Sequence, residues 1–195
     1  MYDIIKSGAN ITAGSSAPVT AIVDAIAHAS TVVINEKFPD SLALPSVSVV
    51  KGKSSVVIVG ADESIVSTAA SSPDKLLYGA YNNVLSSEGV AAVWGGVVGA
   101  TSLSNHYSES FKNTPCVNVN GKAAFQVHPN NLSFPVTHLA FYDKNTTSLS
   151  SINEEEAVKR LLEVTDESKQ DLIKSIVKGV KLSVIGRSTN LSSLL

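Results

Sequence analysis

Four histidines offer the side chain most often used for metal binding and for acid–base catalysis near neutral pH. They are His28, His106, His128 and His138, and none lies in a tight ligand motif such as His-Glu-x-x-His. His128 and His138 could converge across adjacent strands, together with Asp143. The sequence therefore gives His106, His128 and His138 as catalytic candidates, against the alternative that they are ordinary hydrogen-bonded or exposed histidines.

Serine and cysteine nucleophiles are not marked by any local motif. A Ser-x-x-Lys spacing begins at Ser48, Ser72 and Ser175, but a chain this rich in serine produces such spacings by chance. No Gly-x-Ser-x-Gly elbow is present, so the sequence disfavours serine hydrolase chemistry. Cys116 has neither a base nor a basic residue beside it and is interpreted as a small buried side chain.

A glycine-rich run between Gly95 and Gly99 follows the single tryptophan. It matches neither the Walker loop nor the dinucleotide-binding pattern, and no Lys-Ser or Lys-Thr follows it. The run instead indicates that another element approaches the backbone closely. We expect no cofactor and no metal site.

Charged residues make up only 16% of the chain, whereas about 25% is usual in soluble domains. The net charge of −2 gives no field that would attract nucleic acid or anionic lipid, so no nucleic-acid partner is expected. A surface poor in charge is less protected from self-association, which favours a homo-oligomer or a larger assembly. A monomer with a neutral, Ser/Thr-rich surface is the alternative.

Membrane and export segments are not predicted. Residues 89–108 contain no Asp, Glu, Lys or Arg, but only the first half of this stretch is apolar, so it is too short to span a bilayer. The N-terminus has no basic start followed by an apolar run. The single cysteine excludes an intrachain disulfide. A cytoplasmic or virion location is expected.

The elements that would position these residues are read from periodicity and turn signals. Apolar spacing predicts helices over residues 17–29 and 73–87. Hairpins are predicted around Gly52 and around Asn120-Gly121, because glycine accepts the positive φ that tight turns require. Residues 90–102 and 136–142 are expected to be strands, and residues 31–34 a strand or a turn out of the first helix.

The last fifty residues predict a helical pair. Ser151 and Glu154 form a capping box for the first helix, and Asp166 caps the second. The second helix carries a continuous apolar stripe, which we expect to contact a partner or to pack within the chain: Leu172, Ile173, Ile176, Val177 and Val180.

Together these features predict an α+β fold with a mixed or antiparallel sheet, two hairpins, packing helices and a C-terminal helical pair. The expected organisation is a polar N-terminal arm (1–15), an α+β core (16–144), and a linker with amphipathic helices (145–195). Two function hypotheses follow. The first is a structural, self-assembling subunit of a virion, phage tail or similar particle, and the second is a small enzyme or ligand-binding domain with a histidine-lined pocket.

Overall fold

The computed structural model describes residues 2–5, 8–11, 19–62, 65, 68–69, 76–79, 82–92, 97–100, 116–119, 122–125 and 134–195. The strands are β1 (Tyr2–Ile5), β2 (Gly8–Ile11), β3 (Leu42–Lys51), β4 (Ser54–Val59), β5 (Leu76–Gly79), β6 (Asn82–Ser86), β7 (Gly89–Ala92), β8 (Val97–Ala100), β9 (Cys116–Val119), β10 (Lys122–Phe125), β11 (Val136–Tyr142), β12 (Ser150–Ser151) and β13 (Lys181–Ile185). The helices are α1 (Val19–Lys37), α4 (Glu154–Leu162) and α5 (Gln170–Val177), with 3-10 turns η2 (Glu167–Lys169) and η3 (Leu191–Ser193).

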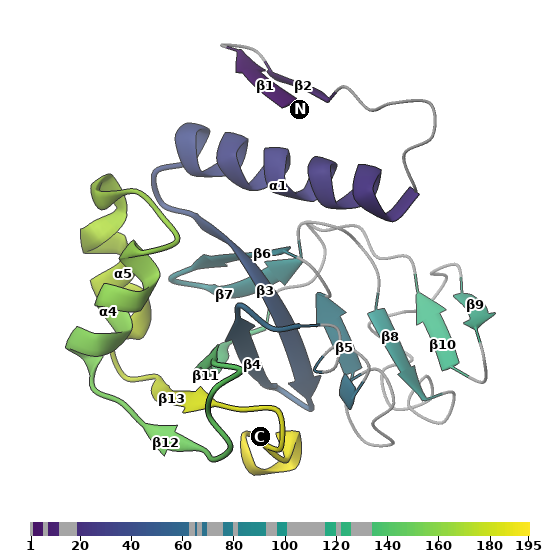
Figure 1. Cartoon of the computed structure of the whole chain (residues 1–195), viewed down its shortest axis with the longest axis vertical. Helices are drawn as coiled ribbons and strands as arrows, with labels where there is room; N and C mark the ends of the chain where they lie inside the picture. Colours follow the sequence, from purple (N-terminus) through teal and green to yellow (C-terminus); the bar gives the residue numbers. More distant parts are fainter. Residues whose placement is uncertain are drawn as a thin grey trace.

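The fold is α+β, as predicted, and is built on one mixed sheet (Figure 1). Its strand order is β12–β13–β11–β4–β3–β5–β8–β10–β9, and β6 and β7 extend from β3. The β4–β11 and β11–β13 pairs are parallel, whereas the other pairs of this sheet are antiparallel. None of the helices that the structure describes combines the length and the apolar character that a membrane crossing needs.

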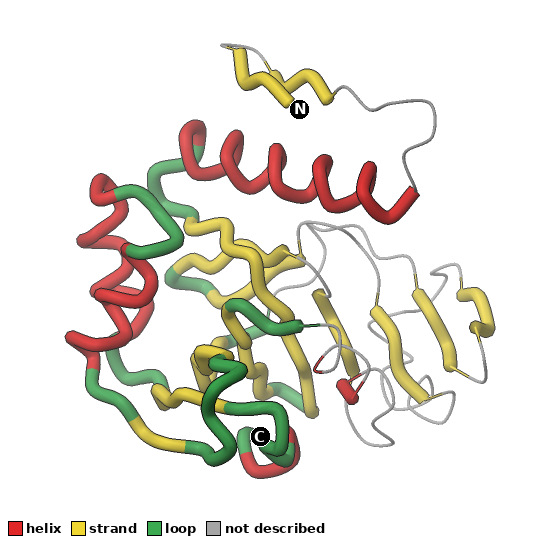
Figure 2. Tube along the Cα trace, viewed as in Figure 1, coloured by secondary structure: helices red, strands yellow, loops and turns green. Residues whose placement is uncertain are grey.

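The centre of the sheet is covered on both faces because β4 is apolar at successive positions. Val57 and Val59 belong to a core that includes buried residues of α4 and α5. Val56 and Ile58 point to the opposite face, into a core that includes residues of the C-terminal segment. Figure 2 shows the helical pair and the C-terminal 3-10 turn at separate places against the sheet. Strand β4 lies between β3 and β11, in the interior of the sheet.

Both predicted hairpins are present. Strands β3 and β4 pair with Lys51 opposite Ser54, and Gly52 between them has φ of 62°, the left-handed region expected for the turn glycine. Strands β9 and β10 pair with Val119 opposite Lys122, which leaves a two-residue connection at Asn120-Gly121. The predicted strand at 136–142 is also confirmed, as β11. Residues 90–102 contribute two strands, β7 and β8.

The first helix is longer than predicted. It continues to Lys37, so residues 31–34, expected as a strand or a turn, are helical despite their β-branched side chains. Packing against β3 outweighs this intrinsic preference. The Asn35 side chain both donates to and accepts from the backbone of Ala43, at 2.9 and 2.7 Å, and thereby joins the end of α1 to β3.

The helix predicted over residues 73–87 is wrong. The described part of this range forms β5 and β6, which pair antiparallel with β3. Asn83 explains the outcome, because its buried amide donates to the Ser46 carbonyl at 2.8 Å and accepts from the Ser48 hydroxyl at 2.7 Å. These bonds satisfy a buried polar group only when the segment lies beside β3. The predicted helix start at 72–74 lies outside the described residues.

Within the predicted polar N-terminal arm (1–15), β1 and β2 form an antiparallel hairpin that contacts α1. The start of the C-terminal helical pair departs from expectation. In the predicted linker, Ser150 and Ser151 form β12, so Ser151 is not a helix cap. The N-cap of α4 is Asn153, whose side chain accepts from the Glu156 amide at 2.9 Å. Asp166 does cap the following 3-10 turn, as predicted.

Candidate functional site

A pocket of about 350 Å³ lies beside β11 and β13, and it contains the one predicted catalytic histidine that the structure describes. Its size is at the lower end of the range for small-molecule sites, about 300–1,000 Å³. Three kinds of side chain share its wall: an imidazole and an ammonium group, three hydroxyls, and three aliphatic groups. These are His138, Lys181, Ser151, Ser183, Ser193, Leu149, Ile152 and Leu182.

The parallel pairing of β11 and β13 brings His138 and Ser183 together. Ala140 lies opposite Ser183 in the register, and His138 is two residues before Ala140 on the same strand. Side chains two residues apart in a strand share a face. Ala140 and Ile185 belong to the core below η3, so His138 and Ser183 lie on that same face. Both are buried, with 6% and 2% of their surface exposed.

Two hydrogen bonds fix the state of the His138 ring. Nδ1 lies 3.2 Å from the Leu194 carbonyl oxygen, and Nε2 lies 2.7 Å from the Ser183 hydroxyl oxygen. A carbonyl can only accept, so Nδ1 must carry the proton. In the neutral ring Nε2 is then an acceptor, and the Ser183 hydroxyl donates to it. The result is a hydroxyl, an imidazole and a carbonyl in a continuous hydrogen-bonded series.

The surroundings keep this imidazole neutral. Burial lowers the pKa of His138 below its ordinary value of 6.5, and the positive charge of Lys181 lowers it further. The bond to the Leu194 carbonyl offsets part of this effect. A neutral ring with a basic Nε2 is therefore the state at pH 7, which is what a general base requires.

The lowered pKa predicts a pH-dependent stability. The unfolded chain binds more protons than the folded chain below about pH 6.5, so the contribution of neutral His138 is fully present above that pH. It is lost as the pH falls below 6.5 towards the folded-state pKa. We expect the free energy of unfolding, measured in urea, to decrease more steeply between pH 7 and pH 5 in the natural chain than in His138→Gln. Parallel pH curves for the two proteins would contradict this prediction.

The other predicted site residues are not brought to this pocket in the part of the chain that the structure describes. His106 and His128 lie outside the described residues, as does any convergence of His128 with His138. His28 is exposed on α1. Ser183 and the Leu194 carbonyl were missed, because a serine in a Ser-rich chain and a backbone oxygen give no local signal. The parallel pairing of β11 and β13 places Ser183 beside His138, and the segment after β13 brings the Leu194 carbonyl to the ring.

The apolar stripe of α5 is filled from within the chain. Ile173, Ile176 and Val177 are buried in the core shared with β4 and α4, and Leu172 and Val180 pack against that core. Val180 lies beyond the helix, which ends at Val177. A partner contact by the three buried members, Ile173, Ile176 and Val177, would therefore require the chain to open.

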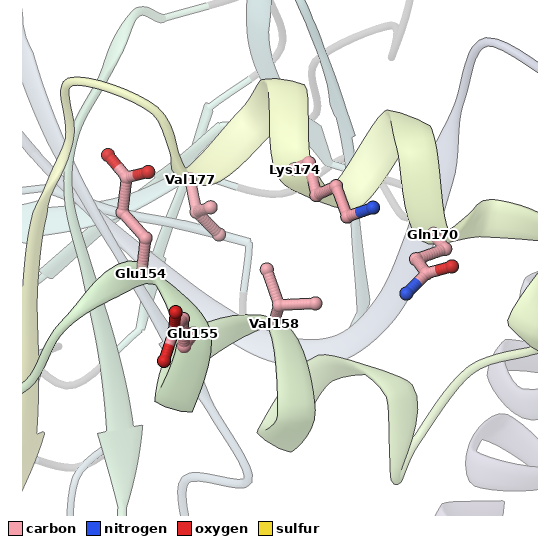
Figure 3. Close-up of a pocket in the computed structure, with 6 residues that line it drawn as sticks. All are labelled: Glu154, Glu155, Val158, Gln170, Lys174 and Val177. Carbon is pink, nitrogen blue, oxygen red and sulfur yellow. The ribbon is translucent and has the colours of Figure 1, made fainter.

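A second hollow, of about 320 Å³, lies between α4 and α5 (Figure 3). Val158 and Val177 lie between the two helices, and polar side chains surround them: Glu154, Glu155, Gln170 and Lys174. The carboxylates belong to the first turn of α4, where the helix dipole stabilises negative charge. Stabilisation of the α4 N-terminus therefore explains why these two glutamates lie beside the hollow.

Among the described residues, no group of three or more histidine, cysteine or acidic side chains is arranged to hold a metal ion. A comparison of the chain with protein-family models and with curated protein sequences finds no match.

Proposed function

We propose that this chain is a structural subunit that assembles with copies of itself, as in a virion, a phage tail or a similar particle. The observation that carries the proposal is the low share of charged residues, 16%, in a chain of 195 residues that folds as an α+β domain. Charged side chains normally keep a monomer soluble, and their scarcity is expected where neighbours cover part of the surface.

The edge strands of the described structure support the proposal. In the described residues β9 pairs only with β10, and β1 and β2 pair only with each other. Edge strands present backbone groups to which another chain can add a strand.

Exposed apolar side chains give a second support. Phe38 is 55% exposed at the end of α1, and Val164 is 49% exposed on the connection after α4. The α4–α5 connection is held to the end of α1 by Lys169, whose ammonium group donates to the Phe38 carbonyl at 2.7 Å. Large apolar groups that stay in water on a charge-poor protein favour a contact between copies.

The assembly state tests the proposal directly. In light scattering at micromolar concentration the purified chain is expected to have a mass several times its 20.3 kDa. Phe38→Ser combined with Val164→Ser is expected to reduce that mass, because it removes apolar area from the contact. Lys53→Ser, an exposed change in the β3–β4 turn, is the matched control and should leave the mass unchanged. A folded monomer over the whole concentration range would contradict the proposal.

A small enzyme or ligand-binding domain is the second candidate function, and the His138 pocket is the observation that favours it. The pocket combines a neutral imidazole, hydroxyls and an aliphatic wall in a space large enough for a small molecule.

A further inference from the structure

We propose that Ser183 is a nucleophile, activated by His138, for the hydrolysis of small carboxylic esters. The inference rests on the second candidate function, a binding pocket at His138, and is independent of the assembly proposal. It follows from the order of the three groups: the Ser183 hydroxyl donates to His138 Nε2 at 2.7 Å, and His138 Nδ1 donates to the Leu194 carbonyl at 3.2 Å.

This order matches the roles that a serine nucleophile requires. The base must accept the hydroxyl proton at one ring nitrogen, and a third group must hold the ring by accepting at the other nitrogen. Here the third group is the Leu194 carbonyl, which fixes the same tautomer that a carboxylate would fix. The carbonyl is a neutral dipole and stabilises the imidazolium less than a carboxylate does. We therefore expect a slower ester hydrolysis than a carboxylate in this position would give.

The pocket determines the class of substrate. Leu149, which is 44% exposed, offers an aliphatic group for a short acyl chain, whereas Ile152 and Leu182 line the edge of the pocket and pack partly against the core under α4 and α5. The positive charge of Lys181 is close enough to lower the pKa of His138. The same ammonium group lines the pocket and would stabilise the oxyanion that forms during attack. A volume of about 350 Å³ admits an acyl group of a few carbons with a small alcohol.

The reaction balances with water as the only co-reactant. Ser183 Oγ forms a bond to the acyl carbon while its proton passes to His138 Nε2, and the bond from the acyl carbon to the alcohol oxygen breaks. His138 gives that proton to the departing alcohol. A water molecule then attacks the acyl-serine, His138 takes its proton and returns it to Ser183 Oγ, and the carboxylic acid leaves.

Labelling with a fluorophosphonate probe, followed by peptide mass spectrometry, tests the proposal on the full chain. We expect the probe on Ser183, no label on that peptide in Ser183→Ala, and a labelling rate about 100-fold lower in His138→Gln. Ser175→Ala, an exposed change on α5, is the control and should be labelled as the natural chain is. Because the probe is located in the unaltered protein, the result does not depend on how well the variants fold.

Binding of butyramide, an amide that the protein is not expected to hydrolyse, distinguishes the binding pocket from the nucleophile. Movement of the His138 imidazole NMR signals on adding butyramide, without labelling of Ser183, would overturn the nucleophile and leave the binding pocket intact. Neither signal movement nor labelling would overturn both. Labelling at a serine other than Ser183 would also overturn the proposal.

Discussion

Ile176→Asp is expected to unfold the chain or to leave it without a cooperative unfolding transition. Ile176 is 7% exposed and packs in the core that α5 shares with β4 and α4. A carboxylate placed among these apolar side chains loses its hydration. A loss of about 4 kcal/mol or more is the expected size, which is a large share of the 5–15 kcal/mol that stabilises a typical domain.

Two companion variants identify the cause. Ser175→Asp places the same charge on the exposed side of the same helix and should change the free energy of unfolding by no more than about 0.5 kcal/mol. Ile176→Val removes one methylene group and should cost about 1 kcal/mol. Urea unfolding followed by circular dichroism measures all three. If Ile176→Asp kept the stability and the oligomer size of the natural chain, the packing of α5 would be wrong.

Lys169→Met should cause the second largest loss, about 3 kcal/mol, because Lys169 uses all three of its donors inside the protein. Its ammonium group donates to the carbonyls of Phe38, Pro39 and Ser41 at 2.7, 3.2 and 3.0 Å. Burial lowers the pKa of Lys169, and the charge of Asp40 opposes that change. Methionine fills a similar volume but leaves the three carbonyls without their charged donor.

Lys174→Met is the matched control for Lys169→Met. Lys174 is exposed on α5, and its ammonium nitrogen lies 3.8 Å from the Asp171 carboxylate on the surface, where such pairs contribute little. The control should therefore retain the natural urea midpoint. Equal shifts of the midpoint in the two variants would show that the bonds from Lys169 to the α1–β3 connection do not stabilise the fold.

Local patterns predicted the elements whose secondary structure follows from their own residues. The turn glycine at Gly52 and the apolar run of β4 identified the β3–β4 hairpin, and the stripe of α5 identified a buried helix face.

The prediction failed where contacts with residues distant in the sequence determine the secondary structure. The Asn83 side chain bonds to Ser46 and Ser48, more than thirty residues earlier, so helix periodicity over 73–87 gave the wrong result.

The candidate site was accessible to sequence reasoning at one residue only. His138 could be chosen as an imidazole on a predicted strand, but its two partners could not. Ser183 is 45 residues away and lies on β13, a strand that was not predicted because it directly follows a helical stripe. The Leu194 carbonyl is a backbone group, and only the fold of the last ten residues brings it to the ring.

The two parallel pairs, β4–β11 and β11–β13, have a consequence for synthesis on the ribosome. Strand β4 emerges with β3 beside it, but β11 follows only about eighty residues later, as the bond from Thr137 to the Ser55 carbonyl shows. The second neighbour of β11 is β13, which is synthesised only after α4 and α5. For most of translation the nascent chain therefore carries an apolar strand with one open side, a surface that chaperones recognise and that tends to aggregate when it is left uncovered.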